Sequence, residues 1–361
     1  MTSSTKSRRH FIKTTGSMAI GALTGAHLIH GYEYKKTKPV VSIVKIKKDN
    51  VEYAVEKAID LLGGLETIAK DKNSIMLKPN LTAEFPSFTT KPTVIRALTK
   101  IMKNAGKEVF IGEGSAVAVG FNFKDNKVYR TQKQDILDPM QEYIFNILGY
   151  TDLAKTEHVQ LINLHGNDLV EVDVPDPLAF KKITLHKSLT DIDMLCSVPM
   201  MKTHGLASVT LGLKNLIGLY PGRIYCAMRA CLHDDAAAAG SPGVAYEILD
   251  MARINKLGLT VIDGSMAMEG DGPSDGEVLK TDVIIAGTNP LATDMVGAKV
   301  MGFEPFEVPT FTTAMKLGMT PHSIEEIEIR GKSIHKVAHA FKRPRLYKWS
   351  DISPIYGNEW I

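Results

Sequence analysis

The sequence has only three cysteines, no acidic residue among its first 30 positions and almost no excess of either charge. Three cysteines are too few for the four thiolates of a usual iron–sulfur cluster, so the chain carries no cluster motif of its own. The apolar run at residues 16–29 is too short to cross a membrane as a helix. The net charge of +3 gives no whole-protein case for nucleic-acid binding.

What is present is the composition of a soluble globular protein, with 44% hydrophobic and 23% charged residues. A chain of 361 residues buries about three quarters of its unfolded surface, so it needs neither disulfides nor a structural metal to fold. We therefore expect a sizeable core.

The first 30 residues resemble a twin-arginine export signal. Arg8 and Arg9 are followed by Phe11, Ile12 and Lys13, and then by a short apolar region rich in Gly, Ala and Thr. Such a signal carries already folded proteins across the membrane. The resemblance implies recognition by the twin-arginine translocation machinery and a periplasmic or otherwise exported location. Whether the signal is cleaved or kept as an anchor stays open.

Apolar strand patterns alternate with helical patterns from residue 39 onward, which is typical of a parallel sheet built from βαβ units. The prediction is one α/β domain over 38–330, with a mostly parallel sheet flanked by helices, a short antiparallel insertion within about 116–190 and a basic tail over 331–361. Strands are expected at 40–46, 74–77, 108–111, 194–198, 259–262 and 283–286. Helices are expected at 51–62, 92–104, 139–148, 210–219, 244–256 and 290–300.

Polar side chains follow the ends of these strands, where loops of an open parallel sheet form the ligand crevice. Lysines near helix N-termini favour an anion, and carboxylates or histidine among them allow proton transfer. The candidate catalytic residues are Lys202, His204, Glu113 and Asp263. The candidate substrate-binding residues are Lys78, Asn80, Lys214, Asn215, Glu269 and Asp294.

The chemistry of two of these residues stays open at this point. Lys202 could bind an anion, or burial near other cations could lower its pKa so that it acts as a base or forms a Schiff base. His204 could equally be a base, a ligand or a hydrogen-bonded structural residue.

The cysteines allow three interpretations. Cys196 lies inside an apolar strand and is expected to be buried. Cys226, Cys231 and His233 lie within eight residues and could bind a transition metal. The two cysteines could instead form a disulfide in an oxidising compartment, or no bond at all.

Several motifs together resemble the bacterial and archaeal family catalogued as domain of unknown function 362. They are Leu77-Lys78-Pro79-Asn80, Val198-Pro199-Met200-Met201-Lys202-Thr203-His204, Leu213-Lys214-Asn215 and Asp263-Gly264-Ser265 with Glu269-Gly270. The resemblance spans about 75–302. Many relatives carry an iron–sulfur segment, which implies redox work and a redox partner protein. A looser likeness is to the lactate racemase family, whose members act on hydroxy acids with a lysine-tethered nickel cofactor.

Two functions follow from these observations. The first is an exported enzyme, resembling an oxidoreductase or isomerase, acting on a small anionic carboxylate or phosphate by acid/base or redox chemistry. The second is a periplasmic ligand- or metal-binding or maturation protein that uses the same crevice without catalysis. The motifs identify neither the substrate nor a cofactor beyond the possible transition metal.

Overall fold

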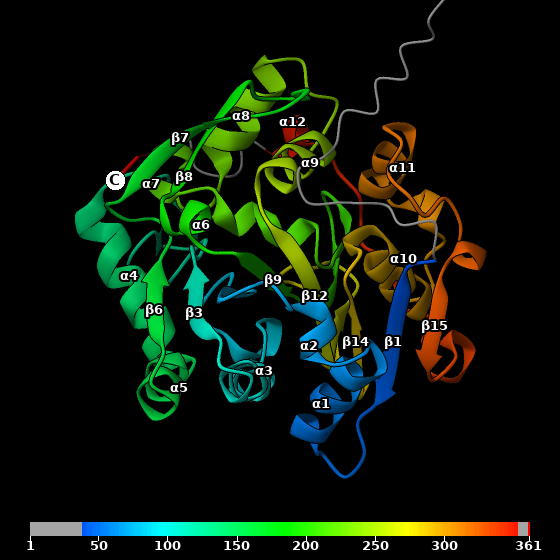
Figure 1. Cartoon of the computed structure of the whole chain (residues 1–361). Helices are drawn as coiled ribbons and strands as arrows, with labels where there is room; N and C mark the ends of the chain where they lie inside the picture. The colour runs from blue at the N-terminus through cyan, green and yellow to red at the C-terminus, as the bar shows by residue number, and fades with distance from the viewer. Residues whose placement is uncertain (1–37, 353–359) are drawn as a thin grey trace, which may run out of the picture.

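The computed structural model describes residues 38–352 and 360–361. Its centre is a large mixed sheet with helices on both faces (Figure 1). The predicted export signal and residues 353–359 of the predicted basic tail lie outside the described residues. Among the described helices, none combines the length and the apolar character needed to span a bilayer.

The order along the sheet is β15 (Glu328–Gly331), β1 (Val40–Lys45), β14 (Val283–Gly287), β12 (Leu257–Glu269), β9 (Met194–Val198), β2 (Ser74–Pro79), β3 (Glu108–Glu113), β6 (Gln160–Asn163). In this order the strands from β12 to β6 run parallel to one another, whereas β14 is antiparallel to both β12 and β1. β10 (Met200–His204), β11 (Ser208–Thr210) and β13 (Glu277–Leu279) extend it beside β12.

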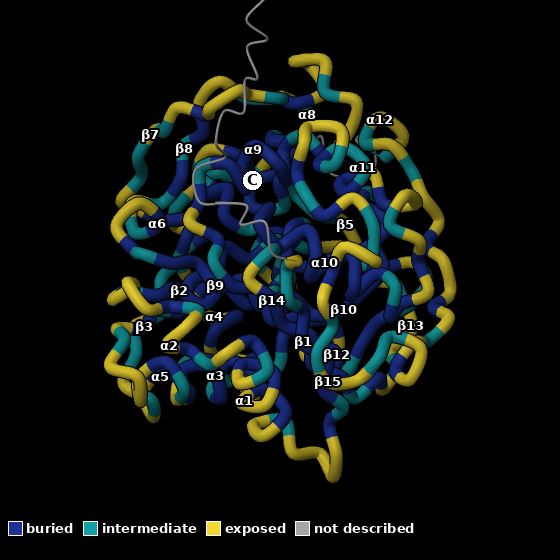
Figure 2. The backbone as a smooth tube through the Cα atoms, turned by 45° about the vertical axis from the view of Figure 1, so that its right-hand side comes forward, coloured by how far each residue is buried: buried dark blue, intermediate teal, exposed yellow. Residues whose placement is uncertain are grey.

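Two helical layers cover the sheet because side chains alternate between its faces. Ile75 and Leu77 of β2 pack on one face with α1 (Val51–Leu61), α3 (Pro92–Asn104) and α4 (Gln134–Ile147). Met76 packs on the other face with α9 (Ala245–Ile254), α10 (Pro290–Val300) and α11 (Pro309–Lys316). The strands form the buried centre of the molecule (Figure 2).

Shorter elements connect this framework. The helices are α2 (Leu65–Ile68), α5 (Tyr150–Glu157), α6 (Ser188–Asp191), α7 (Gly222–Tyr225), α8 (Ala230–Ala238) and α12 (Trp349–Ile352). The 3-10 turns are η1 (Pro86–Phe88), η2 (Lys214–Leu219), η3 (Pro305–Glu307), η4 (Ile324–Glu326) and η5 (Ile334–Lys336). Two antiparallel pairs stand apart from the main sheet: β4 (Phe123–Lys124) with β5 (Lys127–Val128), and β7 (Leu169–Asp173) with β8 (Lys182–His186).

The fold class predicted from the sequence is confirmed, and four local expectations need correction. β6 joins the main sheet parallel to β3, although the sequence pattern assigns it to the antiparallel insertion. Residues 210–219 form the end of β11 and the 3-10 turn η2 instead of a helix. β12 continues to Glu269, seven residues beyond the expected end, and β14 runs antiparallel to it.

The extension of β12 has a packing cause. The sequence pattern ends the expected strand at residue 262, but Gly264 still pairs with Val283 of β14. A Cβ at Gly264 would lie 2.7 Å from the Val283 side chain, so glycine allows two neighbouring strands to approach closely here. After Pro199 the chain continues as β10, which pairs with the added length of β12. This extra strand carries Lys202 and His204.

Candidate active site

A cavity of about 600 Å³ lies beyond the carboxyl ends of β2, β3 and β10. It is closed from other sides by η2, the start of α8 and part of the C-terminal segment. Its lining contains most of the residues expected there from the sequence: Lys78, Asn80, Glu113, Lys202, His204, Lys214 and Asn215. Side chains that are up to 137 positions apart in the chain therefore share one chamber.

Lys78 and Glu113 form a buried ion pair at the floor of the cavity. The Lys78 ammonium donates to Glu113 Oε1 at 2.8 Å, to Asn215 Oδ1 at 3.1 Å and to the Pro79 carbonyl at 2.9 Å. Glu113 also accepts from the backbone N–H groups of Leu81 and Gly114. Burial lowers the pKa of Lys78, while Glu113 opposes that shift. All three ammonium hydrogens are therefore used within the protein.

Asn215 and Gly218 hold this pair in place from η2. Asn215 Nδ2 donates to the Lys78 carbonyl and to Ser197 Oγ, both at 3.1 Å. A Cβ on Gly218 would lie 2.6 Å from both the Lys78 ammonium and Glu113 Oε1, so only glycine permits this approach. Asn80 Nδ2 donates to Asn215 at 3.3 Å, but Asn80 Oδ1 is buried without a hydrogen-bond partner among the described residues. That oxygen can accept a hydrogen bond from a ligand.

Lys202 has a different set of partners. Its ammonium lies 2.8 Å from the Phe88 carbonyl, 3.3 Å from the Pro273 carbonyl and 3.5 Å from Thr82 Oγ1. No carboxylate of the described residues forms an ion pair with it. Burial, assisted by the charges of Lys214 and Lys78, lowers the pKa of Lys202 to about 7. A substantial share of its amine is therefore neutral at neutral pH.

Lys214 and His204 complete the polar side of the cavity. Burial lowers the pKa of Lys214 to about 8, and its ammonium has no hydrogen bond or ion pair within the described part of the chain. Burial and the charges of Lys214 and Lys202 hold the pKa of His204 well below its usual range. His204 Nδ1 accepts from the Leu206 N–H at 3.1 Å. The neutral ring then carries its proton on Nε2, which makes His204 a hydrogen-bond donor.

Sequence reasoning missed Arg229, and it missed Glu247 as the partner of His233. Arg229 uses its guanidinium on backbone carbonyls, including Gly114 at 2.6 Å and Gly218 at 3.0 Å, and so ties the loop after β3 to η2. His233 Nδ1 lies 2.6 Å from Glu247 Oε2 on α9, and both side chains are buried. A carboxylate on Nδ1 orients the ring and leaves Nε2 as the basic nitrogen. Glu247 occupies an ordinary helical position, so no local pattern indicated this contact.

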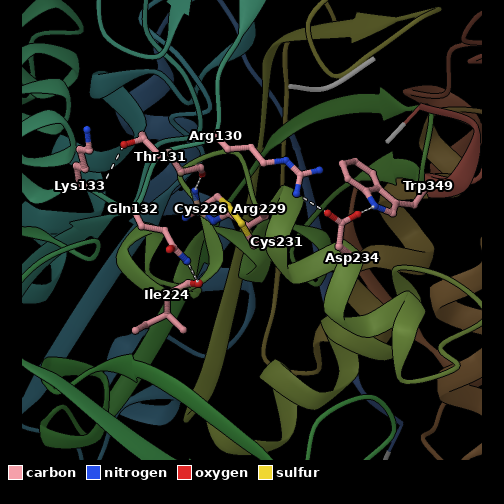
Figure 3. The surroundings of a disulfide bond; sticks show 11 residues. Arg130, Thr131, Gln132, Lys133, Ile224, Cys226, Arg229, Cys231, Asp234 and Trp349 are labelled. Atoms are coloured by element: carbon pink, nitrogen blue, oxygen red, sulfur yellow. Dashed lines mark hydrogen bonds and ion pairs between the residues drawn. A yellow bond between two sulfur atoms is a disulfide. The ribbon is translucent and has the colours of Figure 1, made fainter. Parts of the chain in front are cut away.

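Cys226 and Cys231 form a disulfide, one of the alternatives left open by the sequence (Figure 3). Their sulfur atoms are therefore not thiolates that could join His233 in a metal site, and that predicted ligand set is corrected. No group of three or more His, Cys, Asp or Glu residues in the described ranges is arranged to hold a metal ion. The remaining cysteine, Cys196, is buried and free, so the residues present do not fit an iron–sulfur cluster.

Three carboxylates expected at the site lie outside the described lining of the cavity. Asp263 lies within β12, where it accepts from the Lys91 N–H at the start of α3 at 2.9 Å and from Ser265 Oγ at 2.6 Å. Asp294 accepts from the N–H groups of Gly212 and Leu213. Glu269 accepts from the Lys342 N–H. The continuation of β12 and the reversed direction of β14 explain why these positions differ from the expectation.

Part of the C-terminal segment also lines the cavity. The Tyr347 N–H donates to the Gly205 carbonyl at 3.2 Å, directly after β10. That backbone contact brings Tyr347 and Trp349 to the cavity wall. Trp349 Nε1 donates to Asp234 Oδ1 at 2.7 Å, and Arg130 forms an ion pair with the same carboxylate (Figure 3). This part of the predicted basic tail therefore contributes aromatic surface to the site.

With this geometry established, comparison with known proteins places the chain in a family. Residues 75–299 match the family described as a domain of unknown function (DUF362). The chain belongs to this family. It is also 25% identical over 270 residues to the thylakoid-associated protein sll1697 of Synechocystis sp., a match that covers 74% of this chain and 75% of that protein.

Two solved structures resemble this DUF362 chain at low identity. One is the lactate racemase apoprotein from Thermoanaerobacterium thermosaccharolyticum, at 14% identity and a TM-score of 0.43, covering 73% of this chain and 57% of that one. The other is a protein from Thermotoga maritima, at 14% identity and a TM-score of 0.39, covering 75% and 58%. The DUF362 chain thus spans less than two thirds of either structure's chain.

Proposed function

We propose that this DUF362 protein is an enzyme that binds a small anionic substrate and transfers protons with the amine of Lys202. The observation that carries the proposal is a buried lysine in a cavity, without a carboxylate partner among the described residues and with a pKa of about 7. An amine with that pKa exchanges protons efficiently at neutral pH.

The neighbouring groups support binding of a carboxylate or phosphate. Lys214 and the Nε2–H of His204 are hydrogen-bond donors without a described partner that uses them, and they line the same cavity. The lining holds four lysine and arginine side chains, Lys78, Lys202, Lys214 and Arg229, against three carboxylates, Glu84, Glu113 and Asp275, and Glu113 is paired with Lys78. His233, oriented by Glu247, offers a second proton-accepting nitrogen.

The proposal is tested by acylating the protein with acetic anhydride at different pH values and following each lysine by mass spectrometry. Lys202 should reach half of its maximal reactivity near pH 7, and the exposed Lys100 supplies the reference midpoint in the same samples. Equal midpoints for the two lysines would contradict the proposal. Adding inorganic phosphate should protect Lys202 and leave Lys100 reactive.

The hydrogen bonds that Glu113 and His204 make within the protein favour a second function, which is ligand binding without catalysis. Glu113 accepts three hydrogen bonds and His204 accepts one at Nδ1, so neither is an available base. Incubation with an extract of anionic metabolites separates the two functions. An enzyme consumes one compound in a Lys202-dependent manner, while a carrier retains one compound unchanged.

We also propose that the protein is exported through the twin-arginine pathway. A redox partner protein remains an expectation from the family resemblance. The Arg8–Arg9 pair supports export, and the Cys226–Cys231 disulfide suits an oxidising compartment. Changing both arginines to lysine should retain the protein in the cytoplasm, as measured by cell fractionation. An unchanged distribution would contradict this route.

A further inference from the structure

The cavity is much larger than a small inorganic anion needs. Its volume of about 600 Å³ is within the range of pockets that enclose drug-sized organic ligands. A phosphate ion or a three-carbon acid would fill only a small part of it. The size therefore indicates a ligand with a substantial body in addition to its charged group.

The charged and the apolar side chains of the cavity lining come largely from different segments. Most cationic and amide groups come from the strand ends, from η2 and from Arg229 just before α8, whereas much of the apolar surface comes from the loops after β2 and β3, which also contribute Thr82 and Glu84. The apolar residues from these loops include Leu81, Phe85, Phe88, Val117 and Val119. The Phe85 and Phe88 ring centroids lie 5.3 Å apart, and the Lys202 ammonium lies 5.7 Å from the Phe88 centroid. Phe88 therefore marks the boundary between the two regions.

The apolar region reaches the solvent. Phe85 is 45% exposed and Val119 is 50% exposed, although both line the cavity. Contiguous apolar surface at the edge of a pocket is typical of a ligand-binding groove. Leu206, Ile217 and Met228 add further apolar surface to the lining.

We propose that the ligand is an amphiphilic anion, with a phosphate or carboxylate head at Lys202 and Lys214 and an apolar body against Phe85, Phe88 and Val119. This inference rests on the proposed anion-binding function and adds the class of substrate to it. The unpartnered Asn80 Oδ1 can accept a hydrogen bond from a hydroxyl or amide group near the head.

Titration calorimetry with inorganic phosphate, butyl phosphate, octyl phosphate and octanol tests the inference on the full chain. Each buried methylene strengthens binding by about fourfold, so octyl phosphate should bind on the order of a hundredfold more tightly than butyl phosphate. Octanol, which lacks the charged head, should bind far more weakly than octyl phosphate. All ligands are kept below the concentration at which they form micelles.

Two variants separate the head from the body. Phe85→Ser should lower the affinity for octyl phosphate by about tenfold and leave the affinity for inorganic phosphate unchanged, because Phe85 lies in the apolar region. Phe306→Ser is the matched control, since Phe306 is 72% exposed and lies outside the described lining. Lys202→Met should lower the affinity for inorganic phosphate and for octyl phosphate and leave the affinity for octanol unchanged.

The outcomes separate this inference from the function on which it rests. If octyl phosphate binds no more tightly than inorganic phosphate, the proposal of an amphiphilic ligand is wrong, but the proposal of anion binding stands. If octyl phosphate binds no more tightly than octanol, anion binding itself is wrong. Binding to phosphatidic acid vesicles that Phe85→Ser weakens would support a bilayer source, whereas binding of monomeric octyl phosphate alone would support a dissolved ligand.

Discussion

Lys78 and Lys202 invite comparison because both lie near the carboxyl ends of strands in one sheet and both are fully buried. Lys78 has Glu113 and Asn215 as partners, so its charge is balanced inside the protein. Lys202 has two carbonyls and one hydroxyl, which solvate its ammonium without balancing its charge. Residue type and burial are therefore the same, and the partners alone separate a structural lysine from one that can serve a ligand.

The largest expected effect concerns the balanced lysine. Glu113→Gln removes the negative charge and leaves Lys78 buried without a counter-charge, so the free energy of unfolding should fall by about 3–5 kcal/mol. Lys202→Met breaks no ion pair and should not lower stability to a comparable extent. Urea unfolding of both variants at pH 7 measures the difference.

A double variant checks that the lost ion pair is the cause. Replacing a buried pair by apolar residues of similar size is often close to neutral. Lys78→Met combined with Glu113→Leu should therefore recover most of the stability lost in Glu113→Gln. A Glu113→Gln protein that unfolds at the same urea concentration as the unmodified chain would contradict the structural role of Lys78.

An effect that is smaller for each pH unit follows from the pKa of Lys202, which is about 7 in the folded protein against an ordinary value of 10.5. Between these values the unfolded chain binds more protons at this position than the folded chain. The free energy of unfolding should therefore rise with pH, by up to about 1.4 kcal/mol per pH unit from this group. Below pH 7 both states are protonated and the contribution becomes constant.

Lys202→Met should lose this part of the pH dependence while keeping the contributions of Lys78 and Lys214. The difference between the two stability curves, measured by urea unfolding from pH 6 to pH 10, isolates Lys202. Parallel curves over that range would mean that the folded Lys202 keeps an ordinary pKa.

Much of the fold is predictable because its strands and helices have strong local patterns. The apolar run of β2 and the Pro92 start of α3 both occur where the sequence indicates them. The direction of β14 is not predictable, because a short apolar strand has the same pattern in a parallel and an antiparallel neighbourhood. The length of β12 is hidden by Gly264, whose sequence context is typical of a turn.

The candidate site is predictable to the extent that it depends on parallel strand ends. Lys78 and Glu113 meet at one edge because β2 and β3 are parallel neighbours. The prediction fails for Asp263 because its strand continues beyond it, and for Asp294 because it follows a strand that runs in the opposite direction. Glu247 and Trp349 reach the site only through tertiary packing, which no local pattern encodes.

The last prediction converts the environment of Lys202 toward that of Lys78. Thr82 Oγ1 lies 3.5 Å from the Lys202 ammonium, so Thr82→Asp brings a carboxylate within reach of it. The new carboxylate should raise the pKa of Lys202 above about 7. It should also lower the affinity for inorganic phosphate by about tenfold, because the carboxylate then already balances the charge of the ammonium. Thr82→Asn is the matched control, since it has a similar shape without the charge. Calorimetry gives the affinity and acetic anhydride labelling gives the pH midpoint of Lys202. A raised midpoint with unchanged phosphate affinity would mean that the anion is bound elsewhere in the cavity.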